Sequence, residues 1–176
     1  MIRSSASLAA LSLALLSCVH DRGDCPWNGE GSASLRVGDG TGPIAGGASM
    51  CASGMIVNAG NLDRELQVCG RDFEFTVAIA QSDYETGDRT ITAATPSIGS
   101  ARVAFTALTP NGNFAYLAQP DATGVVHLSG NSPSSGALVA GTLANIHLTL
   151  QSCSASDCTT MPATIELNGA FDARVP

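Results

Sequence analysis

The nine residues Asp72-Phe-Glu-Phe-Thr-Val-Ala-Ile-Ala80 contain the clearest strand pattern of the chain. Large apolar residues alternate with smaller or polar ones along this stretch. One set is Phe73, Phe75, Val77 and Ile79, and the other is Glu74, Thr76, Ala78 and Ala80. Because successive side chains of a strand point to opposite faces of its sheet, this alternation predicts a half-buried β-strand.

Similar patterns recur on both sides of this stretch, and no helical period appears after residue 18. The further strand patterns cover residues 33–37, 53–58, 65–68, 101–108, 113–118, 124–128, 137–150 and 163–173. Gly, Pro, Asn and Asp separate them, as expected for turns. The sequence therefore predicts an all-β domain over residues 32–176, an antiparallel β-sandwich of about 8–10 strands.

Two cysteines predict a hairpin near the C-terminus. Cys153 and Cys158 are separated by four residues, a spacing that suits a disulfide across a turn. If they face each other, Ile146 lies opposite Ile165 and Asn145 lies opposite Glu166. Apolar residues then lie opposite apolar residues, and polar residues lie opposite polar residues, along both strands. We expect this disulfide, and we interpret Gly141, inside the first of these strands, as a bend between two sheets.

The other cysteines leave alternatives open. Cys51 and Cys69 flank a predicted strand and turn, and they are the preferred second disulfide. Cys25 is then a free thiol, although pairing of Cys25 with Cys51 or with Cys69 competes with this arrangement. Cys18 follows the apolar run at residues 8–16, and the chain opens with the basic Arg3. That run is shorter than the ~20 residues needed to span a bilayer and has the form of a secretory signal.

The end of this signal is similar to a bacterial lipobox. The residues Leu15-Leu16-Ser17-Cys18 match it, with Leu16 bulkier than is usual at its position. The resemblance implies cleavage before Cys18 and acylation of that cysteine. More than one acyl chain is needed for stable anchoring, and a triacylated cysteine meets that need. We therefore expect a signal peptide at residues 1–17, a polar tether at 18–31 and the β-domain after it.

The composition excludes several functions. Fifteen acidic residues face eight basic ones, and all eight are Arg, so there is no Lys for a Schiff base or a phosphate-binding loop. The net charge of −7 and the absence of an Arg cluster argue against nucleic-acid binding. No HExxH, CxxC or Gly-x-Ser-x-Gly motif occurs, so we expect no metal, no cofactor and no enzymatic activity.

Several short features also match a family resemblance. They are Ser82-Asp83-Tyr84, Gly124-Val125-Val126-His127-Leu128, Gly141-Thr142-Leu143 and Asn168-Gly-Ala-Phe171-Asp-Ala173. Their order resembles small bacterial lipoproteins of uncharacterised function with a β-sandwich layout. The resemblance covers roughly residues 66–175 and implies fold and location, with no catalytic residues to carry over. Val19, rather than Asp, follows Cys18, which implies the outer membrane, facing the periplasm or the cell surface.

The remaining candidate sites are weak. Asp83, Glu85 and Asp88 form the densest acidic cluster, and alternating carboxylates in a Gly-containing loop suit Ca2+. Trp27, Tyr84, Tyr116 and Phe114 make a thin aromatic set for glycan stacking. His127 and His147 are expected to face solvent. The leading hypothesis is a lipid-anchored structural or interaction module with an envelope protein or glycan as partner. The alternatives are a glycan- or Ca2+-binding module using loops 83–88 and 110–123, and an exported hydrolase.

Overall fold

The computed structural model describes residues 31–38, 49–57, 63–69 and 73–175. These residues form ten β-strands and one short 3-10 helix, η1 (Cys158–Thr160). The strands are β1 (Gly31–Gly38), β2 (Ser49–Val57), β3 (Asp63–Cys69), β4 (Phe73–Ala80), β5 (Gly87–Ile91), β6 (Ser100–Thr109), β7 (Gly112–Leu117), β8 (Val125–Asn131), β9 (Leu138–Cys153) and β10 (Thr164–Arg174). The predicted all-β class is confirmed.

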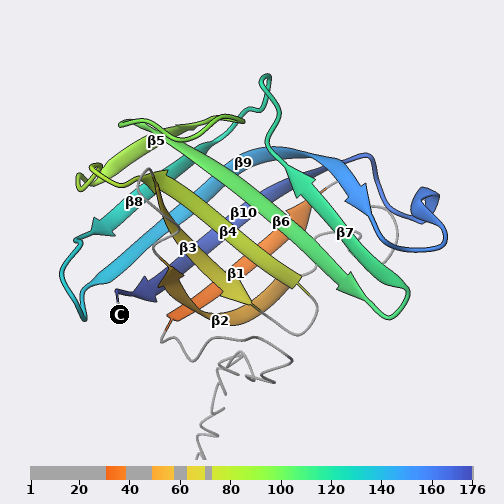
Figure 1. Cartoon of the computed structure of the whole chain (residues 1–176), viewed down its shortest axis with the longest axis horizontal. Helices are drawn as coiled ribbons and strands as arrows, with labels where there is room; N and C mark the ends of the chain where they lie inside the picture. The colour runs from red at the N-terminus through yellow and green to blue at the C-terminus, as the bar shows by residue number, and fades with distance from the viewer. Residues whose placement is uncertain (1–30, 39–48, 58–62, 70–72, 176) are drawn as a thin grey trace, which may run out of the picture.

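The ten strands belong to one sheet that closes on itself (Figure 1). Antiparallel pairing runs from β10 through β1, β2, β3, β4, β6, β7 and β9, and β9 pairs again with β10. Two separate sheets packed face to face are therefore not confirmed. Closure occurs because β9 and β10 pair with each other and each also has a partner on its other edge.

The sheet forks along one side. The start of β6 pairs with β5 in parallel, at Ser100 and Ala101, while its later part pairs antiparallel with β7 from Ala104 onward. The strand β9 is shared in the same way between β8 and β7. As a result, β5 and β8 lie at one end of the closed sheet and β7 at the other (Figure 1). We call these the β5–β8 end and the β7 end.

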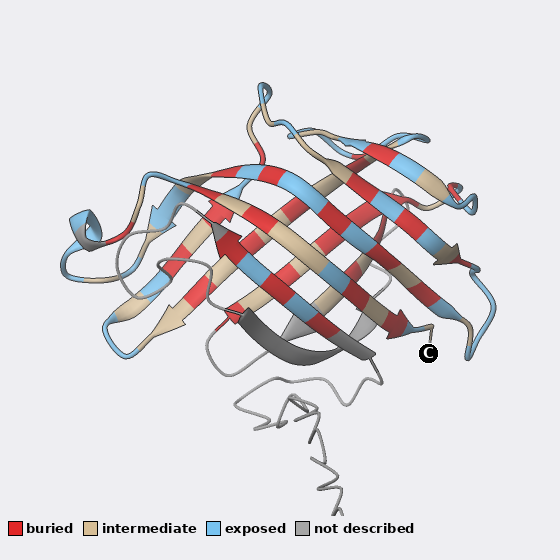
Figure 2. Ribbon diagram, turned by 180° about the vertical axis from the view of Figure 1, so that it is seen from behind, coloured by how far each residue is buried: buried red, intermediate tan, exposed pale blue. Residues whose placement is uncertain are grey.

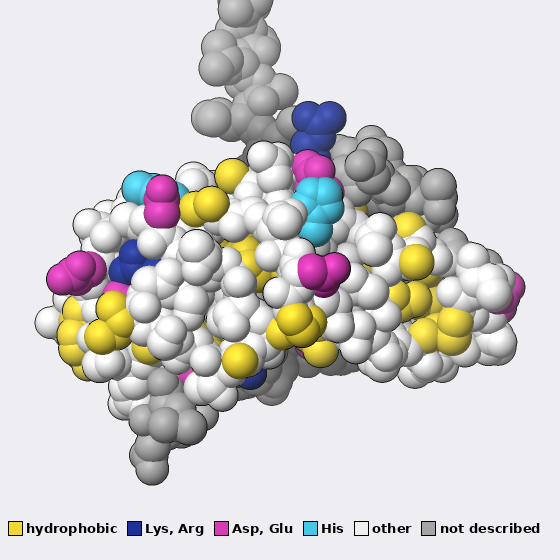
Figure 3. Space-filling view, turned by 90° about the horizontal axis from the view of Figure 1, so that it is seen from above, with side chains coloured by type: hydrophobic (Ala, Val, Ile, Leu, Met, Phe, Trp, Pro, Cys, Tyr) yellow, Lys and Arg dark blue, Asp and Glu magenta, His cyan; other side chains and the backbone are white. Residues whose placement is uncertain are grey.

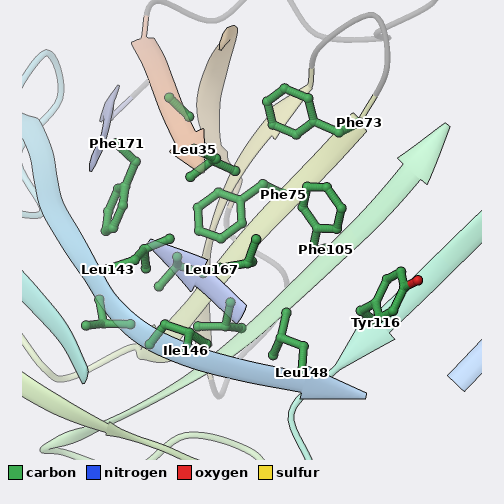
Figure 4. Close-up of a cluster of buried hydrophobic side chains, with 14 of the residues drawn as sticks. Leu35, Phe73, Phe75, Phe105, Tyr116, Leu143, Ile146, Leu148, Leu167 and Phe171 are labelled. Atoms are coloured by element: carbon green, nitrogen blue, oxygen red, sulfur yellow. The ribbon is translucent and has the colours of Figure 1, made fainter. Parts of the chain in front are cut away.

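Alternating side chains fill the interior of the closed sheet. Figure 2 shows buried and more exposed residues in turn along most strands, and Figure 4 shows the inward side chains meeting from several strands. The ring of Phe105 lies 5.8 Å from that of Phe73 and 6.4 Å from that of Tyr116, centroid to centroid. The predicted inward face of β4 is correct, since Phe73, Phe75, Val77 and Ile79 are all buried.

The outer face of β4 is more buried than the pattern predicts. Ala78 is fully buried although it belongs to the outer set. In the register it lies between Glu65 on β3 and Arg102 on β6. Arg102 Nη2 donates to Glu65 Oε1 at 3.2 Å, so the two long side chains cross over the small methyl group. A small residue is needed there because a charged pair covers it.

The C-terminal hairpin forms with a different register from the predicted one. The disulfide joins Cys153 to Cys158 with a Cα–Cα distance of 5.9 Å. However, Ile146 pairs with Leu167 instead of Ile165, and Glu166 pairs with His147 instead of Asn145. The chain makes η1 directly at Cys158, so β10 begins only at Thr164 and the pairing shifts by two residues. A shift of two keeps every side chain on its predicted face.

Gly141 lies opposite Leu128 and Phe171. The register between β8 and β9 shifts directly beside it, because Ser129 is an extra residue of β8 between the Leu128–Gly141 and Gly130–Ala140 pairs. A Cβ atom there would lie 2.8 Å from Phe171 Cζ and closer still to the carbonyl oxygen of His127, so the glycine allows a close approach. A second irregularity lies three to four residues later, where Asn145 has a φ of 51° and the register with β10 shifts. Gly141 therefore adjoins a register shift, but the strands on both sides of it belong to one sheet, so a bend between two sheets is not confirmed.

Candidate functional site

A buried polar network occupies the β5–β8 end, and its centre is Asp83. This residue lies in the connection between β4 and β5, and its carboxylate is completely buried. Arg89, an inward residue of β5, donates from Nε and Nη2 to its two oxygens, each at 2.6 Å. The backbone N–H of Gly99 adds a third bond at 3.1 Å. Burial raises the pKa of Asp83, but these donors outweigh burial and hold that pKa below its usual value.

Arg64 and Asn131 extend the network across the interior. Arg64 Nη2 donates to the backbone oxygen of Asp83 and, at 2.7 Å, to Asn131 Oδ1. Asn131 Nδ2 in turn donates to the backbone oxygens of Asp83 and Glu85, at 2.7 and 3.0 Å. The ring of Tyr84 covers the guanidinium of Arg64, with 4.8 Å from Cζ to the ring centroid. The network therefore holds the 81–86 connection against β3, β5 and β8.

One atom of this network has no partner. Among the buried side-chain nitrogen and oxygen atoms of the described residues, Arg64 Nε alone makes no hydrogen bond. Burial lowers the pKa of Arg64, while nearby Tyr84 and Asp83 act in the opposite direction. Arg64 also lines a small cavity of about 10 Å3. The other walls of that cavity are apolar: Leu66, Val77, Ile79, Leu128, Val139 and Phe171.

The three acidic residues predicted as a Ca2+ site have separate roles. Asp83 is buried and bonded to Arg89, whereas the side chains of Glu85 and Asp88 are exposed. Asp88 bonds to His127 instead. Within the described ranges, no group of three or more His, Cys, Asp or Glu side chains is placed to hold a metal ion. The acidic cluster thus contains a buried ion pair, Asp83 with Arg89, and an exposed contact, Asp88 with His127.

The two described histidines face solvent, each beside a carboxylate. His127 Nδ1 lies 2.7 Å from Asp88 Oδ1, and His147 Nε2 lies 3.5 Å from Glu166 Oε2. Figure 3 shows both imidazoles on the upper face, with acidic side chains next to them. His127 is paired across the strands with Asp88 on one side and Thr142 on the other. These residues form an exposed row on three strands.

A larger groove lies on the outer surface where the sheet forks. It has a volume of about 300 Å3 and is lined by Glu65, Thr76, Ala93, Arg102, Ala104, Leu117 and Ala118. Arg102 crosses its floor, with Asp63 Oδ2 at 3.4 Å and Glu65 Oε1 at 3.2 Å. This volume is at the lower limit for small-molecule sites. The groove combines one cation, one carboxylate, a hydroxyl and an apolar wall, so it suits a small ligand with several hydroxyl groups.

The remaining predicted site residues lie partly outside the described chain. Cys18, Cys25 and Trp27 fall in residues that are not described. Cys69 is opposite Ser53 in the strand register, and Cys51 is opposite Ser34. The side chains of Cys51 and Cys69 are not described, so their disulfide stays a prediction. Of the three described members of the aromatic set, Tyr116 and Phe114 are buried in the core and Tyr84 is exposed.

Sequence reasoning missed Arg64, Arg89 and Asn131. Arg64 follows a predicted turn and precedes an apolar strand, which resembles an ordinary surface position. The sequence does contain one signal for Arg64: it lies two residues before Leu66 on the same strand, so both side chains point to the same, inward face. Tyr116 was noted only as an aromatic residue, yet its hydroxyl donates to the backbone oxygen of Pro162 at 3.0 Å. Burial raises the pKa of Tyr116 to about 12.

Comparison with known proteins identifies no relative. No protein-family profile, no curated protein and no solved structure matches the chain. In the described residues, no helix is long and apolar enough to cross a membrane. The functional argument therefore depends on the residues themselves.

Proposed function

We propose that the chain is a lipid-anchored protein of the bacterial outer membrane and acts as an interaction module. The observation that carries this proposal is Leu15-Leu16-Ser17-Cys18 directly after an apolar run. Acylation of Cys18 supplies the anchor, and the β-domain is presented to an envelope protein or a glycan. The proposed role is non-catalytic.

The same proposal includes an orientation of the domain. β1 begins at Gly31 and pairs there with Ala173, at the β5–β8 end. Three exposed apolar side chains belong to this end: Tyr84 (50% exposed), Ile98 (69%) and Leu138 (44%). The thirteen residue steps from Cys18 to Gly31 reach at most about 45 Å. We propose that the β5–β8 end faces the lipid surface that the acyl chains enter.

Intact mass spectrometry tests the anchor. The protein is isolated from the membrane fraction of a bacterium that processes lipoproteins, with and without reduction and thiol alkylation. We expect a chain beginning at Cys18 with added acyl mass, and four alkylations that appear only after reduction. The Cys18→Ser variant is expected to leave the membrane fraction, while the matched Cys25→Ser variant stays in it. An unacylated chain that retains Cys18 in the soluble fraction contradicts the proposal.

Fluorescence quenching tests the orientation separately. Trp27 is the single tryptophan, so a Trp27→Phe background accepts a new tryptophan at a chosen position. We expect brominated lipids to quench Ile98→Trp strongly and Leu117→Trp weakly in vesicles carrying the acylated protein. Leu117 is the control because it is also an exposed apolar residue (40%) but lines the outer groove. Equal quenching at both positions contradicts the orientation and leaves the anchor intact.

A second candidate function is ligand binding in the outer groove. The groove around Arg102 supports it, because its mixed polar and apolar walls suit a saccharide. A glycan array probes the wild-type protein and an Ala104→Trp variant that fills the groove. We expect a specific signal from the first and its loss from the second. The absence of any signal from the wild-type protein removes this candidate.

A further inference from the structure

The charged groups at the outer groove are unequal in number. Glu65 lines the groove, and Asp63 lies two residues earlier on the same strand. Both carboxylates share one atom of the guanidinium, Arg102 Nη2, at 3.2 Å and 3.4 Å respectively. The bonds of the buried pair of Asp83 and Arg89 are 2.6 Å by comparison. The three groups at the groove therefore carry one net negative charge, and their contacts are long.

Glu65 is the carboxylate that a ligand can reach more easily. Its side chain is 26% exposed, whereas that of Asp63 is 11% exposed. Within the described ranges only Oε1 of Glu65 is bonded, so Oε2 can accept a further hydrogen bond. An ammonium group suits this acceptor, because hydrogen bonds between charged groups are stronger than those between neutral groups. It also balances the extra negative charge.

The rest of the groove suits a sugar ring. Thr76, Ala104 and Leu117 lie opposite one another across β4, β6 and β7. Glu65 and Arg102 belong to the neighbouring row of the same surface, so polar groups and an apolar wall lie side by side. A pyranose ring has a face of C–H groups and an edge of hydroxyl groups, and it therefore matches both parts of this surface.

We propose that the outer groove binds an amino sugar with a free, protonated amine, such as a hexosamine without an acetyl group. The ammonium group binds the Glu65 carboxylate, Arg102 donates to hydroxyl oxygens of the sugar, and Leu117 packs against the C–H face of the ring. This inference rests on the second proposed function, ligand binding in this groove, and names the class of saccharide. It is independent of the lipid anchor.

Three probes that differ only in one substituent test the proposal: glucosamine, N-acetylglucosamine and glucose. Saturation-transfer NMR measures their affinities for the full-length protein at about pH 6, where an amine is protonated. We expect glucosamine to bind at least about fivefold more tightly than either neutral sugar, which is the contribution of one charge contact close to water. Raising the salt concentration from about 0.05 M to 0.5 M is expected to reduce this preference without changing the affinity for glucose.

Two variants locate the contact. Glu65→Gln keeps the shape of the side chain and removes its charge, so we expect the affinity for glucosamine to fall to that for glucose. Asp88→Asn is the matched control, because it makes the same change of net charge at an exposed carboxylate of the β5–β8 end and is expected to keep the preference. If Glu65→Gln does not fold, Ala104→Trp and the salt dependence decide, since Ala104→Trp fills the groove and is expected to lose all three sugars.

The outcomes separate the class of sugar from ligand binding itself. Equal affinities for the three sugars overturn the amino-sugar inference and leave ligand binding in the groove intact. A preference for glucosamine that survives Glu65→Gln, or binding of methylammonium as tight as that of glucosamine, also overturns the inference. If none of the three sugars binds to the wild-type protein, both the inference and the function on which it rests are wrong.

Discussion

The replacement Asp83→Asn tests the polar network most directly. The side chain of Arg89 is 5% exposed and that of Asp83 is fully buried, so the amide leaves a charged guanidinium without its carboxylate in the interior. Breaking a buried pair in this way costs about 3–5 kcal/mol. A domain of this size has a free energy of unfolding of about 5–15 kcal/mol, so the variant is expected to lose between about a fifth and all of its stability.

Equilibrium urea unfolding followed by circular dichroism measures this cost. Asp88→Asn is the matched control, because its partner His127 and Asp88 itself are largely exposed and such pairs contribute about 0–1 kcal/mol. The double variant Asp83→Leu/Arg89→Met is expected to be more stable than Asp83→Asn, since it removes both charges together. A cost below about 1 kcal/mol for Asp83→Asn refutes the view that this pair organises the β5–β8 end.

The pH dependence of the same pair has a definite sign. The pKa of Asp83 is lowered in the folded state, so the folded protein binds fewer protons than the unfolded chain. The stabilisation is therefore present above the unfolded pKa of about 4 and is lost as the pH falls through the folded pKa. As the pH falls below about 4, wild-type protein is expected to lose more stability than Asp83→Asn. Parallel pH profiles for the two proteins contradict this assignment.

Three further outcomes are expected. Tyr116→Phe loses one hydrogen bond and is expected to lower the free energy of unfolding in urea by about 0.5–1.5 kcal/mol. In wild-type protein, ultraviolet titration is expected to find a phenol with a pKa of about 12. Because the folded state raises this pKa, the stability of the wild-type protein is expected to fall above about pH 10. Gly141→Ala forces a methyl group against the backbone of His127, so calorimetry is expected to show a loss of about 1–3 kcal/mol. Joint replacement of Cys153 and Cys158 by Ser opens a short loop and is expected to cost about 2 kcal/mol, with a Tm matching that of the reduced wild-type protein. Unchanged unfolding in any of these variants contradicts the contact it removes.

The sequence predicted the strands well where side chains alternate. The pattern at 72–80 gave the correct inward face, because the period of two does not depend on the partner strands. β5 was missed because Gly87–Ile91 is short and has no alternating apolar residues. Closure of the sheet depends on β9 pairing with β7, β8 and β10. Such pairing between distant strands leaves no local signal.

The candidate sites were harder to predict for a related reason. Asp83 belongs to an acidic run that looks solvated, yet its partner Arg89 follows only six residues later and turns inward. Asn131 is 48 residues away from Asp83 in the chain and meets it only when β8 is in place. The outer groove needs β5 and β7 to share one edge of β6. Spacing along the sequence carries none of these three relationships.

The pairing of β1 with β10 has a consequence for how the protein forms. All eight residues of β1 pair with β10, and these strands lie at opposite ends of the described chain. The closed sheet cannot be completed until β10 has been synthesised, because all of β1 pairs with it. Contacts so distant in sequence slow folding, so we expect a long-lived open precursor whose unpaired edges need protection. β10 thus controls when the sheet closes as well as contributing to the final stability.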